Sequence, residues 1–86
     1  MIISNDLLKE VISFANTHKA YELNQLLTTN DKYAFALEKC IFLGYICGIS
    51  TVRNALGIPA FQEIEGCFVT ENGLKFLQNS SFSTDL

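Results

Sequence analysis

Residues 28–49, TTNDKYAFALEKCIFLGYICGI, decide the fold that this sequence predicts. Residues 28–30 all have side-chain oxygens that can cap a helix, and Asp31 places a carboxylate at the positive end of that helix. Gly44 can adopt the left-handed backbone conformation that ends a helix. The segment therefore predicts a helix over residues 31–43, and the alternation of apolar residues after the glycine predicts a strand.

Two further helices are predicted before this segment. Ser4 or Asn5 can cap the first, in which apolar residues recur at helical spacing over residues 7–15. Residues 21–27 contain three leucines at helical spacing and predict a second, short helix. The polar turn at 28–30 then leads into the helix over 31–43, which is the order of a helix-turn-helix pair.

Two antiparallel strands are predicted after the third helix. Residues 45–52 and 63–69 both alternate in the manner of half-buried strands. Residues 53–61 between them contain a glycine and a proline and predict a long, apolar hairpin loop. Gly48 and Gly66 fall inside the predicted strands, where a glycine marks a bulge or a close approach of two backbones.

A last helix is predicted at the C-terminal end. Thr70 can cap it, and Glu71 lies in its first turn at the favourable end of the helix dipole. Gly73 weakens that first turn, which predicts a close packing contact at this position. The order of the elements predicts an α+β winged helix, with a three-helix helix-turn-helix core, a β-hairpin wing and a C-terminal helix. We expect one domain over residues 1–79 and a flexible tail over 80–86.

The outer face of the third helix carries the functional argument. A helical wheel places Tyr33, Ala36, Leu37 and Cys40 on the side that should face the first two helices. The opposite side carries Asp31, Lys32, Phe35, Glu38, Lys39 and Phe42. Base edges in DNA are matched by Arg, Asn, Gln, Ser or Lys, whereas this face combines balanced charges with two phenylalanines one heptad apart.

Three hypotheses remain open for Phe35 and Phe42. The two rings can form a surface for a partner protein or a second copy of the chain, because exposed aromatic residues often anchor interfaces. The wing or the C-terminal tail can instead fold back over them. The third hypothesis is base readout, for which phenylalanine offers little beyond contact with a thymine methyl group.

Composition limits the classes of function. The chain has 86 residues, 49% of them hydrophobic, and a formal net charge of −3, which argues against a general binder of nucleic acid or membrane surfaces. A local basic patch is still compatible with this charge. The uncharged run at 40–52 is shorter than the ~18 residues of a membrane span, and the N-terminal residues lack the basic region of a signal peptide. We therefore expect a cytoplasmic protein that binds no membrane.

The sequence contains no recognisable catalytic or metal-binding motif. The three cysteines, Cys40, Cys47 and Cys67, form no CxxC pair, and His18 is the single histidine. The sequence therefore has neither the ligand pattern of a zinc site nor the even number of cysteines typical of a disulfide framework. We expect the cysteines to act as small buried hydrophobic residues. No phosphate loop or nucleophile motif is present, which predicts a protein without catalytic residues, metal or cofactor.

Two motifs carry a family resemblance. Residues 33–46, YxxALxxCxxxGYI, resemble the end of the recognition helix in small winged-helix proteins, and residues 69–77, VTENGLKFL, resemble their closing helix. With the length and element order, the chain resembles the YjcQ-like family of Gram-positive bacteria and their phages. The resemblance implies a winged helix of phage or prophage origin and no catalytic residues. Phe42 departs from it where a charged residue would suit the helix end, and Cys40 where leucine is usual.

Two functional hypotheses follow. The first is a DNA-binding transcriptional regulator, expected to be dimeric, that contacts the phosphates of double-stranded DNA through Lys32, Lys39 and Arg53. The alternative is a protein-interaction module, such as a phage-encoded adaptor or inhibitor of a host protein. Its expected contact residues are Phe35, Phe42, Leu56, Ile58 and Phe61.

Overall fold

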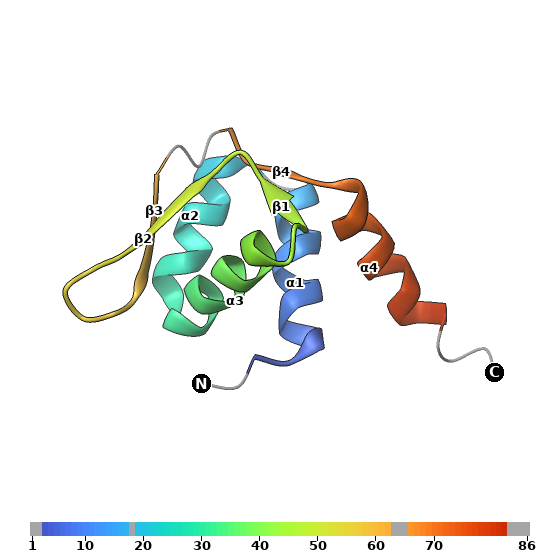
Figure 1. Cartoon of the computed structure of the whole chain (residues 1–86), viewed down its shortest axis with the longest axis horizontal. Helices are drawn as coiled ribbons and strands as arrows, with labels where there is room; N and C mark the ends of the chain where they lie inside the picture. Colours follow the sequence, from blue (N-terminus) through green and yellow to red (C-terminus); the bar gives the residue numbers. More distant parts are fainter. Residues whose placement is uncertain (1–2, 18, 63–65, 83–86) are drawn as a thin grey trace.

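The computed structural model describes residues 3–17, 19–62 and 66–82, which form an α+β domain (Figure 1). The elements follow in the order α1 (Asn5–Thr17), α2 (Ala20–Thr29), α3 (Asp31–Phe42), β1 (Ile46–Cys47), β2 (Ser50–Arg53), β3 (Pro59–Gln62), β4 (Phe68–Val69) and α4 (Glu71–Phe82). The predicted class and the order of helices, hairpin and closing helix are confirmed. Residues 83–86 of the expected tail lie outside the described residues, and α4 includes residues 80–82.

Side-chain caps begin three of the helices at the predicted places. The Ser4 hydroxyl accepts a hydrogen bond from the Leu7 N–H at 3.1 Å, and the Asn30 side chain accepts one from the Lys32 N–H at 2.9 Å. The Thr70 hydroxyl accepts from the Gly73 N–H at 3.1 Å. Each cap satisfies an amide that has no partner within its helix, which is why these residues fix where α1, α3 and α4 begin.

The turn between α2 and α3 is shorter than predicted. Residues 28–30 were expected to form it, but α2 continues to Thr29 and Asn30 alone separates the two helices. The hydroxyls of Thr28 and Thr29 donate to the carbonyls of Gln25 and Leu26, both at 2.7 Å. These hydroxyls therefore bind the last turn of α2 and do not cap α3.

The core lies between the first three helices and β1. Its fully buried apolar residues are Leu8, Val11 and Ile12 of α1, Leu23 of α2, Ala36, Leu37 and Cys40 of α3, and Ile46 of β1. Each buried leucine or isoleucine contributes about 1.5–3 kcal/mol of transfer free energy. The inward face predicted for the third helix is thus confirmed for Ala36, Leu37 and Cys40, while Tyr33 is half-buried and donates to Glu10 of α1 at 3.0 Å.

The C-terminal end of α3 meets the N-terminal end of α4, so the two motifs at residues 33–46 and 69–77 lie side by side. The Thr70 hydroxyl donates to the Gly44 carbonyl at 2.6 Å, and the Thr70 N–H donates to the Tyr45 carbonyl at 2.9 Å. A Cβ atom on Gly73 would lie 2.4 Å from the same Tyr45 oxygen, which confirms the predicted close contact. The Tyr45 ring also stacks on Phe76 of α4 with centroids 4.7 Å apart.

The strand pairing differs from the prediction of one long hairpin. β1 pairs with β4, and β2 pairs with β3, as two separate antiparallel ladders. Residues 48–49 separate β1 from β2, whereas the longer segment 63–67 separates β3 from β4, so one register cannot continue through both ladders. The predicted pairing of residues 45–52 with 63–69 is therefore confirmed for 46–47 with 68–69, but residues 50–53 pair with 59–62 instead. Residues 63–65 lie outside the described residues.

The predicted hairpin loop over 53–61 is too long, because β3 already begins at Pro59. The Asn54 N–H donates to the Ile58 carbonyl at 3.0 Å, so the next pair, Arg53 with Pro59, is a non-hydrogen-bonded pair. Such a position requires no N–H from proline, which explains how a residue that usually breaks strands begins one here.

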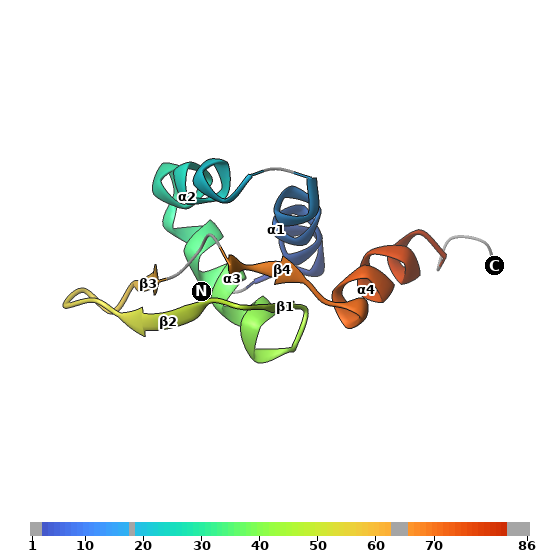
Figure 2. The same ribbon diagram turned by 90° about the horizontal axis from the view of Figure 1, so that it is seen from above.

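The β2–β3 hairpin and α4 project from opposite sides of the three-helix core (Figures 1 and 2). The register places Thr51, Arg53, Pro59 and Phe61 on one face of the hairpin, and Pro59 on this face is buried. The other face carries Ser50, Val52, Ala60 and Gln62, which are all exposed. The first of these faces is thus the one that packs toward α3.

Candidate functional site

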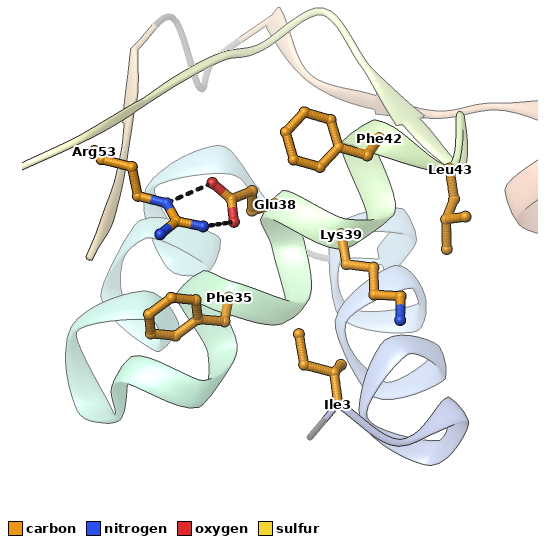
Figure 3. Close-up of a pocket in the computed structure, with 7 residues that line it drawn as sticks. All are labelled: Ile3, Phe35, Glu38, Lys39, Phe42, Leu43 and Arg53. Atoms are coloured by element: carbon orange, nitrogen blue, oxygen red, sulfur yellow. Dashed lines mark hydrogen bonds and ion pairs between the residues drawn. The ribbon is translucent and has the colours of Figure 1, made fainter. Parts of the chain in front are cut away.

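A hollow of about 490 Å³ lies on the outer side of α3, where Arg53 at the turn end of the β2–β3 ladder reaches the helix (Figure 3). We call it the α3 hollow. Its apolar lining residues are Ile3, Phe35, Phe42 and Leu43, and its charged lining residues are Glu38, Lys39 and Arg53. Residues from the N-terminal segment, from α3 and from β2 therefore converge on one surface.

Glu38 and Arg53 form a two-pronged ion pair inside the hollow. Arg53 Nε donates to Glu38 Oε2 at 2.9 Å, and Arg53 Nη2 donates to Glu38 Oε1 at 2.6 Å. Arg53 Nη1 also donates to the Gly57 carbonyl at 3.1 Å. The hydrogen bond to Glu38 raises the pKa of Arg53 above its ordinary value. This pairing ties the hairpin to α3 and cancels the charge of both groups.

The burial of Glu38 corrects the expected outer face of the third helix. That face was predicted to expose Glu38, yet only 11% of its side chain is exposed, against 52% for Arg53. The hairpin covers the middle of this face, because the long, positively charged side chain of Arg53 lies over Glu38 and binds its carboxylate. The other polar residues predicted there, Asp31, Lys32 and Lys39, are exposed.

The two phenylalanines of α3 have different surroundings. Phe35 is half-buried, and Arg53 Cζ lies 5.4 Å from its ring centroid, so the hairpin partly covers this ring. Phe42 is 74% exposed, and the neighbouring Leu43 is 45% exposed. Among the described residues the wing thus covers one ring in part and leaves the other in contact with solvent.

The two lysines of α3 also differ. Lys39 lines the α3 hollow, is exposed, and forms no ion pair with any residue in the described part of the chain. Lys32 does not line the hollow, and its Nζ lies 5.1 Å from the ring centroid of Tyr33. Of the three predicted DNA-binding residues, Lys39 and Arg53 are therefore brought together, and Lys32 is not.

The remaining predicted interface residues do not join this surface. Leu56 is 82% exposed in the hairpin turn, whereas Ile58 is half-buried. Phe61 packs against the core cluster and so has a structural role. Of the five predicted contact residues, Phe35 and Phe42 line the hollow.

Sequence reasoning missed three of the lining residues, namely Ile3, Glu38 and Leu43. Glu38 was placed on the correct helical face, between Phe35 and Phe42, but nothing near it in the sequence indicated that Arg53 is its partner. Nothing in the sequence indicated that Ile3 and Leu43 would line a surface hollow, since Ile3 precedes α1 and Leu43 was assigned to the end of the third helix.

No cluster of metal ligands is found in residues 3–17, 19–62 and 66–82. The structure brings together no group of three His, Cys, Asp or Glu residues there that could hold a metal ion. Burial raises the pKa of the Cys40 thiol to about 12, and burial also raises that of Cys67, while Cys47 is exposed. The expectation of buried cysteines is thus wrong for Cys47, and His18 lies outside the described residues.

No protein-family model, curated protein or solved structure matches this chain. We therefore infer a function from the geometry of the α3 hollow and from general physical chemistry. No helix within the described residues is both long enough and apolar enough to cross a membrane.

Proposed function

We propose that this protein is a non-enzymatic winged helix that acts as a protein-interaction module, with the α3 hollow as its docking surface. The order of three helices, hairpin and closing helix is compatible with a winged helix, a fold in which α3 would be the recognition helix. The resemblance to the YjcQ-like family supports the same fold. The partner is a protein whose apolar side chains enter the hollow.

The observation that carries this proposal is the pairing of Arg53 with Glu38. A phosphate-binding wing needs free cations, and the single basic residue of residues 53–61 already binds a buried carboxylate. Phe42, which is 74% exposed, lines the same hollow together with Ile3, Phe35 and Leu43. An exposed aromatic residue next to a concave apolar surface is typical of the centre of a protein interface.

DNA binding is the second candidate, and one observation favours it. Lys32 and Lys39 are both exposed and lie on the same helix, two turns apart, where a recognition helix would present them to the backbone of DNA. Two free cations provide little phosphate neutralisation, however, and they belong to a chain with a net charge of −3. We therefore place this candidate second.

A peptide selection tests the proposed function. A displayed library of random peptides is selected against the purified wild-type protein, and each enriched peptide is then titrated against the Phe42→Glu variant. We expect enriched peptides to lose at least about tenfold in affinity, because the substitution removes the exposed ring from the centre of the interface and puts a polar carboxylate in its place.

Phe68→Glu provides the matched control, since Phe68 is another exposed phenylalanine, at 56%, that does not line the hollow. Circular dichroism confirms that both variants are folded. Peptides that bind both variants as tightly as wild type would contradict the α3 hollow as the docking surface. A dimer of the wild type that dissociates in the Phe42→Glu variant would identify a second copy of this chain as the partner.

A further inference from the structure

Resting on the proposed function, we propose that the α3 hollow selects an apolar side chain of the partner that is accompanied by a carboxylate, and that Lys39 binds this carboxylate. The partner segment is thus acidic as well as apolar. Three features of the molecule support this: the lining of the hollow, its charge, and the hydrogen bonds at the nearby end of α3.

The lining of the hollow explains why it selects an apolar side chain. Phe35, Phe42 and Leu43 contribute ring and methyl surface, and Ile3 closes the side toward α1 (Figure 3). The volume of about 490 Å³ falls within the roughly 300–1,000 Å³ of typical ligand sites, so a whole phenylalanine or leucine side chain can enter. Because Phe42 is 74% exposed, an occupant that covers it gains by removing apolar surface from water.

The charges of the hollow explain why the partner should also carry a carboxylate. The hollow contains two cations and one anion, and Glu38 is already bound by Arg53 through two hydrogen bonds. Lys39 therefore supplies one positive charge that no described residue neutralises. The hollow thus has the opposite sign to the chain as a whole, whose net charge is −3. A carboxylate is the complementary group that a partner protein can supply.

The C-terminal end of α3 borders the hollow at Leu43, and its free carbonyls would repel an anion. Three of them are already bound by backbone amides: Leu43 N–H donates to the Lys39 carbonyl at 2.9 Å, Gly44 N–H to Ile41 at 3.1 Å, and Tyr45 N–H to Cys40 at 2.8 Å. The end of the helix therefore opposes a carboxylate less than an uncapped end would, and Lys39 lies in that last turn.

Two small probes test the inference without a known partner. N-acetyl-L-phenylalanine has a carboxylate beside its ring, and N-acetyl-L-phenylalanine amide has the same ring without the charge. Both are titrated into the ¹⁵N-labelled protein while the amide resonances of α3 and β2 are followed by NMR. We expect the acid to bind about two- to fivefold more tightly than the amide, which is the effect of one partly exposed ion pair.

Lys39→Gln should remove this preference, and the matched variant Lys32→Gln should retain it, because Lys32 lies over Tyr33 and outside the hollow. Equal binding of the two probes, or a preference that survives Lys39→Gln, would overturn the acidic specificity while leaving apolar docking intact. If neither probe shifts the resonances of α3 and β2, the inference fails, and the peptide selection on Phe42 decides the proposed function separately.

Discussion

Gly48→Ala is expected to destabilise the protein by about 2–5 kcal/mol, which is a large share of the roughly 4–13 kcal/mol that a domain of this size has. Gly48 has a φ of +82°, a conformation that costs any residue with a Cβ atom about 1–2 kcal/mol. An added Cβ would also lie 2.2 Å from the Gly66 carbonyl oxygen. This overlap adds about 1–3 kcal/mol, because backbone must move to relieve it.

Gly57→Ala separates the two contributions. Gly57 has a similar φ of +79°, but nothing lies within 4 Å of the place where its Cβ would be. We expect this variant to lose only the conformational part, about 1–2 kcal/mol. Urea unfolding followed by circular dichroism measures both variants. Equal losses would contradict the close approach of Gly48 to Gly66, and with it the way the two ladders are joined.

Arg53→Met is expected to have the second large effect, through Glu38. The methionine stem can still cover Phe35, but the Glu38 carboxylate, with 11% of its side chain exposed, loses its partner. A buried group left without its partner costs at least about 1–3 kcal/mol, and more when it is charged. Urea unfolding should show this loss, and amide exchange should accelerate in the hairpin that the pair holds on α3.

Two comparisons make this prediction specific. Lys75→Met breaks a long, exposed pair with Glu71 at 4.0 Å and should leave stability unchanged. The double variant Glu38→Leu with Arg53→Met should recover much of the loss, because apolar residues of similar size can replace a buried ion pair. If the single Arg53 variant were as stable as Lys75→Met, the pair would not hold the hairpin, and the argument that Arg53 is engaged would fail.

The features that sequence predicted well are those that depend on neighbouring residues. Asn30, Gly44 and Thr70 act on amides or carbonyls within a few positions along the chain, so their side chains and backbone preferences mark helix ends directly. Gly73 was also informative, because a glycine in a first helical turn needs a compensating contact, and the Tyr45 carbonyl provides the reason.

The features that sequence missed depend on residues far apart in the chain. Pro59 was assigned to a loop because glycine and proline mark residues 53–61 as a turn, and only the register with Arg53 shows that a strand can begin at a position that needs no N–H. Glu38 was assigned to a solvated face because its partner follows fifteen residues later, on the hairpin. Register and partner choice are settled by tertiary packing, so local patterns do not specify them.

The central claim is that the outer face of α3 binds a partner protein and does not bind the phosphates of DNA. Fluorescence anisotropy of a labelled, random-sequence duplex of about 30 base pairs, titrated with the purified protein at low and near-physiological salt, tests it most directly. We predict no binding at either salt concentration, because Arg53 is held by Glu38. Micromolar binding that weakens steeply with salt and disappears in Lys32→Gln and Lys39→Gln would contradict the claim and establish DNA as the ligand.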